Sequence, residues 1–323
     1  MDQHSARQTL IDNKTLFISC VVPVYNEAAN IETFVKALHA TIAQASSQFE
    51  LILIDDGSKD DTLRHIIELT HALNNIKLIS LSRNFGKEVA LTAGIDHAIG
   101  DVIILIDADF QHPLDIIPTF ISEWVSGYDM VYAVRKDREA ESFMKRKASQ
   151  LFYFLMNKFS QLEIQDGAGD FRLMDKKLVQ ALKTFPERTR FMKGLYAFIG
   201  FQTKAIPYEV QKRSSGKSRF GFSKLTELAL NGITSFSDIP LRIWSLIGFF
   251  ISFISLIYAI YIIAETLIVG NDLPGYPTLI VAIMFLGGIQ LLSIGILGEY
   301  IARIFTEVKN RPLYLIKMKK GFD

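Results

Sequence analysis

The sequence has little cysteine, no excess of charge of either sign and no glycine-rich nucleotide loop. Cys20 is the single cysteine among 323 residues, which excludes a disulfide framework and any cysteine-rich metal site. It lies in an apolar run, so we expect a buried thiol. Lys and Arg number 35 against 34 Asp and Glu, which argues against a nucleic-acid partner bound by bulk electrostatics. Neither a G-x-G-x-x-G pattern nor a Walker loop occurs, so dinucleotide and P-loop chemistry are unsupported.

Apolar residues are abundant, at 49% of the chain, and two uncharged runs near the C-terminus carry the excess. They cover residues 243–264 and 276–297, and a helix of either length spans roughly 33 Å, enough to cross a bilayer core. The segment between them contains Asn271, Asp272 and Pro274, which favour a turn. The alternative, two buried core helices, requires shorter helices with a polar edge. We therefore predict a transmembrane helix hairpin within residues 241–303.

Basic residues flank this hairpin on both sides and are absent from its linker. They are Lys212, Arg213, Lys217, Arg219, Lys224 and Arg242 before it, and Arg303, Lys309, Arg311, Lys317, Lys319 and Lys320 after it. Positive residues stay on the cytoplasmic side of a membrane. We therefore expect a protein of the inner (cytoplasmic) membrane, with a cytoplasmic domain over residues 1–235, a basic cytoplasmic tail over 304–323, and both termini in the cytoplasm. The polar N-terminus lacks the apolar region of a signal peptide.

The domain of residues 1–235 alternates short apolar runs with helical patterns, which predicts an α/β fold with a mostly parallel sheet. The predicted strands are 17–24, 49–54, 76–81 and 101–106, and the predicted helices include 28–43 and 87–99.

Polar residues follow each predicted strand. They are Tyr25-Asn26-Glu27, Asp55-Asp56, Ser82-Arg83-Asn84 and Asp107-Ala108-Asp109. Ligands of such sheets bind beyond the carboxyl ends of the strands, so we expect the functional site there. In an extended segment Asp107 and Asp109 point the same way, and hard carboxylate oxygens favour Mg²⁺ or Mn²⁺. A capped turn is the alternative explanation of this pair.

Six motifs occur in a characteristic order. They are VVPVYNE (21–27), LIDDGSKDDT (53–62), SRNFGKE (82–88), DADFQHP (107–113), GDFRLMD (169–175) and KRSSGKSRFGFSK (212–224). Together they resemble the family 2 glycosyltransferases of GT-A fold, and within these the polyprenyl-phosphate glycosyltransferases, a group that includes bactoprenol glucosyltransferases and dolichyl-phosphate mannose synthase. The resemblance covers essentially the whole chain, including the hairpin.

The resemblance implies a role for particular residues. The nucleotide-sugar residues it implies are Pro23, Tyr25, Glu27, Asp55, Asp56 and Asp107; the metal ligands are Asp107, Asp109 and Gln111; the acceptor-phosphate residues are Arg135, Arg146, Arg213 and Lys217; the catalytic residues are Asp170 and Asp109. A basic acceptor loop with an interfacial helix is expected over 205–238. Relatives commonly carry Asp or Glu where this chain has His112, which puts a third metal carboxylate in doubt. Three of these positions have simpler explanations: Tyr25 packing on a helix, Asp55 or Asp56 capping one, and Asp170 pairing with Arg172.

The implied activity is inverting transfer of a hexose, glucose by preference, from a UDP-sugar to undecaprenyl phosphate at the cytoplasmic face, for surface polysaccharide (O-antigen) or envelope modification. N-acetylglucosamine, galactose, mannose or an aminoarabinose are alternative sugars. A membrane scaffold that binds nucleotide sugars without transferring them is a second class of function. Gly287, Gly288, Gly295 and Gly298 in the second span would allow close helix packing, so we expect a capacity for homo-oligomers.

Overall fold

The computed structural model describes residues 3–135, 168–188, 190–209 and 275–322, together with scattered positions between 246 and 268. Its centre is an eight-stranded sheet in the order β7-β5-β6-β4-β1-β2-β3-β8. The strands are β1 (Phe17–Val24), β2 (Gln48–Asp55), β3 (Ile76–Leu81), β4 (Val102–Leu105), β5 (Met130–Arg135), β6 (Ala168–Asp175), β7 (Thr203–Tyr208) and β8 (Ile316–Lys320). Strands β4, β1, β2 and β3 run parallel to one another, which confirms the predicted α/β architecture.

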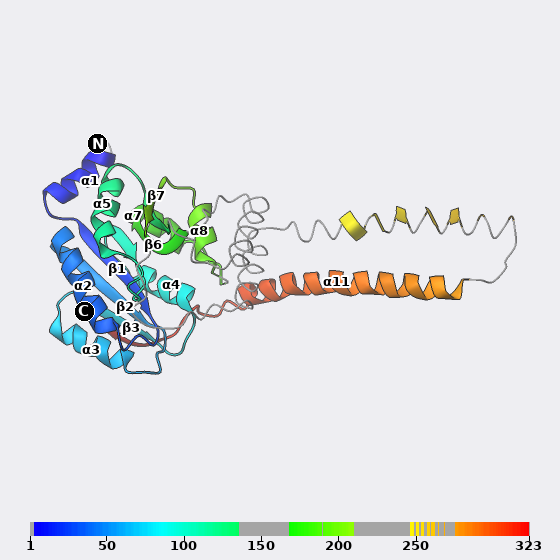
Figure 1. Cartoon of the computed structure of the whole chain (residues 1–323), viewed down its shortest axis with the longest axis horizontal. Helices are drawn as coiled ribbons and strands as arrows, with labels where there is room; N and C mark the ends of the chain where they lie inside the picture. Colours follow the sequence, from blue (N-terminus) through cyan, green and yellow to red (C-terminus); the bar gives the residue numbers. More distant parts are fainter. Residues whose placement is uncertain are drawn as a thin grey trace.

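Helices cover both faces of this sheet (Figure 1). They are α1 (Gln3–Asp12), α2 (Ile31–Ala45), α3 (Thr62–Ala72), α4 (Lys87–His97), α5 (Ile117–Val125), α7 (Lys176–Lys183) and α8 (Met192–Phe198). Side chains alternate between the two faces of a strand, so β1 contributes residues to the hydrophobic core on each face of the sheet. Ile18 and Cys20 pack with α2 and α5, whereas Val21 packs with α4 on the opposite face.

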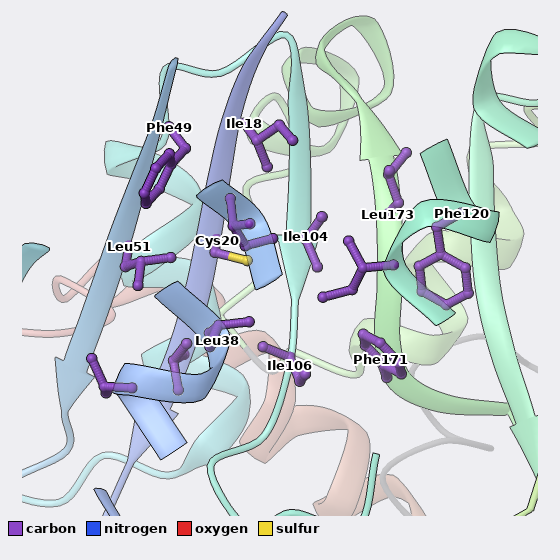
Figure 2. Packing of buried hydrophobic residues seen from close by; sticks show 14 of the residues in the cluster. Ile18, Cys20, Leu38, Phe49, Leu51, Ile104, Ile106, Phe120, Phe171 and Leu173 are labelled. Carbon is purple, nitrogen blue, oxygen red and sulfur yellow. The ribbon is translucent and has the colours of Figure 1, made fainter. Parts of the chain in front are cut away.

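The core on the α2 and α5 side contains Cys20, whose side chain lies between Leu38 of α2 and Ile104 of β4 (Figure 2). Cys20 is 0% exposed, and burial raises the pKa of its thiol. The expectation of a buried cysteine is therefore confirmed. Phe120 of α5 and Phe171 of β6 continue this core, with ring centroids 4.8 Å apart.

The C-terminal segment differs from the predicted tail. Residues 316–320 form β8, which pairs antiparallel with β3 and closes that edge of the sheet. The run Ile-Lys-Met-Lys-Lys carries three charges in five residues, so hydropathy alone describes it as solvated tail. Its partner strand is distant in sequence, and only the folded chain brings the two together.

The second apolar run is part of α11 (Tyr276–Val308), which projects from the α/β body (Figure 1). Residues 285–308 of this helix are long and apolar enough to cross a membrane. Side chains such as Leu291, 72% exposed, and Ile294, 63% exposed, face away from the protein. The helix extends beyond the predicted end at residue 297. In the first predicted span, 243–264, the described positions are helical, and side chains such as Phe250 and Ile254 are exposed.

Candidate active site

Polar side chains gather at the carboxyl edge of the parallel strands. Strand β2 ends there in Asp55, Tyr25 directly follows β1, and Asp107 lies two residues after β4. Strand β6 runs antiparallel to β4, with Leu105 opposite Arg172, so the beginning of β6 brings Asp170 to the same edge. Residues distant in sequence thus converge at the place where sheets of this type bind ligands.

The segments after β1 and β2 are joined by hydrogen bonds from the backbone. The Asn26 amide donates to Ser58 Oγ at 3.0 Å, and the Lys59 amide donates to Asn26 Oδ1 at 2.8 Å. The Glu27 amide donates to Thr62 Oγ1 at 2.8 Å. Asn26 adopts φ +55°, a left-handed conformation that asparagine tolerates better than most residues. These bonds position the half-buried Tyr25 and Glu27 beside the Asp55 loop.

Asp55 and Asp56 are 1% and 3% exposed, and both bind the protein itself. Asp55 accepts from the Ser58 amide at 3.0 Å and from Ser80 Oγ at 2.9 Å. Asp56 accepts from the amides of Phe85 and Gly86, at 2.7 and 2.9 Å. Burial raises the pKa of Asp56, and these two amide bonds oppose the rise. Asp56 thus binds the backbone at the start of α4. Contact of Asp55, Asp56 and Pro23 with a nucleotide stays a prediction.

A turn after β4 brings Asp109 and Gln111 together. The Gln111 amide donates to Asp109 Oδ1 at 3.0 Å, and Phe110 between them adopts φ +58°. Arg135, at the end of β5, donates from Nη2 to Gln111 Oε1 at 2.9 Å. One oxygen of Asp109 therefore caps the turn, as the alternative explanation of the Asp107 and Asp109 pair proposed. The hydrogen bond from Arg135 places this residue, predicted to bind the acceptor phosphate, beside the predicted metal ligand Gln111.

Lys87, the first residue of α4, bridges two carboxylates of the site. Its Nζ lies 2.8 Å from Asp107 Oδ1 and Oδ2 and 2.5 Å from Asp170 Oδ2. Burial opposes ionisation of both acids, but the charge of Lys87 holds the pKa of Asp107 and of Asp170 below the usual range. His112 stands near the same cluster, with Nε2 at 3.7 Å from Asp107 Oδ2.

The alternative ion pair of Asp170 with Arg172 takes a different form. Arg172 donates from Nη2 to the carbonyl oxygen of Gly169 at 2.6 Å and from Nε to that of Asp170 at 3.4 Å. Arg172 therefore holds the backbone of this segment, while Lys87 binds the carboxylate.

Glu88, next to Lys87, adds a further carboxyl group. Burial and the nearby charge of Asp170 raise the pKa of Glu88 to about 7, and the Met192 amide donates to its Oε2 at 3.2 Å. Sequence reasoning assigned no role to Lys87 or Glu88. Both are the last residues of the SRNFGKE motif, which was the signal in the sequence that could have indicated a role for them. Their contacts in the structure are with Asp107 after β4, Asp170 of β6 and Met192 of α8.

A divalent cation is implied by the family resemblance, and the donor atoms fit one. Within the described ranges, no group of three or more His, Cys, Asp and Glu side chains is arranged to hold a metal by itself. Asp109 and Gln111 nevertheless bring hard oxygen atoms to one turn, with Asp107 two residues earlier. Mg²⁺ is commonly held by one or two carboxylates together with substrate phosphates and water. The site thus suits a cation that arrives with, or is completed by, a phosphorylated substrate.

Arg146, Arg213 and Lys217 lie outside the described residues, as does most of the predicted acceptor loop over 205–238.

Sequence comparison assigns the family. Residues 239–304 match the GtrB C-terminal hairpin. An uncharacterized glycosyltransferase of Synechocystis is 45% identical over 96% of this chain and 97% of its own length. The bactoprenol glucosyl transferase of Shigella phage SfII is 48% identical over 93% of this chain and 97% of its own. Glucosyl-3-phosphoglycerate synthase from Mycobacterium tuberculosis, a solved structure, overlaps with a TM-score of 0.48 at 19% identity, covering 70% of this chain and 80% of that one. Residues 19–183, about half of the chain, match glycosyl transferase family 2, and the chain belongs to that family.

Proposed function

We propose that this glycosyltransferase moves glucose from UDP-glucose to undecaprenyl phosphate at the cytoplasmic face of the membrane, with inversion at the sugar. The observation that carries the proposal is the 48% identity to a bactoprenol glucosyl transferase, which extends over 93% of the chain. The carboxylate cluster at the sheet edge and the exposed apolar helix α11 supply the two features that such a reaction needs.

The donor side of the proposed reaction is formed by the ends of β1, β2 and β4. Asp109 and Gln111, with Asp107, would hold a Mg²⁺ or Mn²⁺ ion, which when bound neutralises charge on the leaving nucleoside diphosphate. Tyr25, Glu27 and Asp55 surround the expected base and ribose. Lys87 already engages Asp107, so we assign Asp109 the larger part in metal binding.

The acceptor side centres on Asp170. A phosphate monoester has its second pKa near about 6, so it is already nucleophilic at neutral pH. Lys87 keeps Asp170 ionised, and a carboxylate so held is a weak base. We therefore propose that Asp170 orients the acceptor more than it removes a proton. A single displacement from an α-linked donor gives a β-linked product, and recovery of an α-linked lipid product would contradict this scheme.

A membrane anchor is required if the acceptor is a lipid phosphate. A polyprenyl chain cannot leave the bilayer without exposing a large apolar surface to water, so the enzyme must be held at the membrane. We propose two spans, of which α11 is the second, and a cytoplasmic catalytic body. Apart from their chain neighbours and their own helix backbone, Gly287, Gly288, Gly295 and Gly298 have no described atom within 4 Å of an added Cβ, which leaves room for another helix, such as that of a second copy of the chain.

The test is transfer by the full chain in detergent, with undecaprenyl phosphate, Mg²⁺ and a panel of radiolabelled sugar nucleotides. We expect label in the organic phase from UDP-glucose alone. Asp109→Ala should reduce transfer by roughly 100-fold or more, the scale of losing one electrostatic group at a reaction centre. Asp115→Ala, at an exposed carboxylate nearby, is the matched control and should transfer normally.

Other results would redirect the proposal. Transfer of another sugar would replace glucose with that sugar and leave the reaction class intact. Binding of a sugar nucleotide without transfer to any lipid would favour the scaffold alternative.

A further inference from the structure

Asp170 is attached to the site through one side of its carboxylate. Oδ2 lies 2.5 Å from Lys87 Nζ, whereas Oδ1 is buried and has no hydrogen-bond partner among the described residues. The side chain of Asp170 is 14% exposed. Among the described residues, Lys87 is therefore the group that sets the direction of this carboxylate.

The same ammonium group holds Asp107 at 2.8 Å. Two carboxylates in one partly buried site repel each other, and without a cation between them one would turn away or take up a proton. Lys87 removes this repulsion and fixes the two carboxylates relative to each other. It thereby links the end of β4, on the donor side, to the start of β6, on the acceptor side.

The position of Lys87 is itself set by the fold. It is the first residue of α4, and the two residues before it, Phe85 and Gly86, donate their amides to Asp56. Asp56 is 3% exposed at the end of β2. The Lys87 backbone is thus anchored to the sheet, while 43% of its side chain remains exposed at the site.

We infer that Lys87 is a positioning residue of the transfer reaction, which holds the Asp170 carboxylate at a fixed place relative to Asp107 and offsets the negative charge of both where the acceptor phosphate must approach. The inference rests on the proposed function for the identity of the acceptor. The ionic coupling of Lys87 with Asp170 does not depend on it.

The first experiment measures that coupling without activity, from melting temperatures of the detergent-solubilised full chain at pH 7.5. In the wild-type background Asp170→Asn removes an ion pair and should lower the melting temperature. In the Lys87→Met background the same substitution removes one of two uncompensated carboxylates and should raise it. This reversal of sign supports the inference. Equal shifts in both backgrounds would overturn it.

The second experiment measures transfer with the donor that the wild type uses. Lys87→Met should lower kcat by roughly 100-fold, the scale expected when a reacting group is misplaced by about 1 Å. In the Asp170→Asn background it should lower kcat by less than about threefold, because the group it positions is already lost. Lys87→Arg, which keeps the charge, should recover part of the rate. Lys36→Met, at an exposed pair with Glu32, is the matched control and should change neither quantity.

Losses that multiply in the double variant would show that Lys87 acts by a route other than Asp170 and would overturn the positioning role. If the wild type transfers no sugar at all, the proposed function fails, and the melting temperatures still decide whether Lys87 holds Asp170.

Discussion

At the scale of single residues, the candidate active site places the ammonium group of Lys87 between two carboxylates. Asp107 and Asp170 remain ionised because Lys87 lies between them, and Glu88 next to Lys87 does not share that contact. Carboxyl groups of one cluster therefore have pKa values shifted in opposite directions. The decisive factor is which side chain each residue meets in space.

Glu88 gives a prediction for the pH dependence of stability. Its pKa rises from 4.5 to about 7 on folding, so between these values the folded protein holds a proton that the unfolded chain has released. Stability should therefore fall as the pH rises from about 5 to about 7 and be level above that. A shift of this size corresponds to about 3 kcal/mol.

We expect Glu88→Gln to abolish this fall, and to be more stable than the wild type at pH 8 but not at pH 4.5. Thermal melts of both proteins across this range measure it. Glu68→Gln, at a side chain 62% exposed, serves as the control and should follow the wild-type curve. Parallel curves for Glu88→Gln and the wild type would contradict the assignment.

At the scale of elements, the strand after the apolar helix α11 completes the catalytic sheet. Strand β8 pairs with β3, and the Ser82 amide donates to the Leu315 carbonyl oxygen at 2.8 Å. Tyr314 donates from its hydroxyl to Asp96 Oδ2 at 2.9 Å, at the far end of α4. The C-terminal segment thus contacts both β3 and α4, the two elements that flank the loop leading to Lys87.

A chain ending at Leu313 should expose the edge of β3 and lose these contacts. We expect a lower melting temperature and self-association, since an uncovered strand edge offers free backbone groups to another chain. Size-exclusion chromatography and thermal melts measure both effects. Lys317→Ala keeps the strand backbone and should behave as the wild type. A truncated chain that stays monodisperse and melts normally would show that β8 is dispensable.

At the scale of the whole molecule, the end of α11 is fixed against the catalytic body. The Arg188 amide donates to Glu307 Oε1 at 2.8 Å, and the Arg188 guanidinium donates to the Arg311 carbonyl oxygen at 2.5 Å. Arg188 lies just before α8, whose first residue Met192 contacts Glu88. The apolar helix and the active site are therefore parts of one connected structure (Figure 1).

The proposed topology can be tested by cysteine labelling. Cys20 is completely buried, with the pKa of its thiol raised, so the wild type should give little background. In intact bacterial cells, an impermeant maleimide should label Asn271→Cys, in the linker between the predicted spans. It should label Lys317→Cys only after the membrane is permeabilised. Labelling of Lys317→Cys in intact cells would reverse the orientation.

Local patterns in the sequence predict the order of strands and helices in the first part of the chain, the polar residues that follow the strands and the apolar run within α11. Hydrophobic periodicity is local, so β1 and β3 were predicted with their observed boundaries. The family motifs named Asp107, Asp109 and Asp170 for the same reason, because each lies in a short contiguous pattern.

Which of these residues lie together depends on contacts between segments that are remote in the sequence. The link between Asp107 and Asp170 through Lys87 depends on the antiparallel pairing of β6 with β4 and on the start of α4. The incorporation of β8 depends on β3 offering an unpaired edge to a strand more than two hundred residues further along the chain. A sequence pattern records the chemistry of each residue, but distances between remote segments are set by packing and strand pairing, which no local pattern contains.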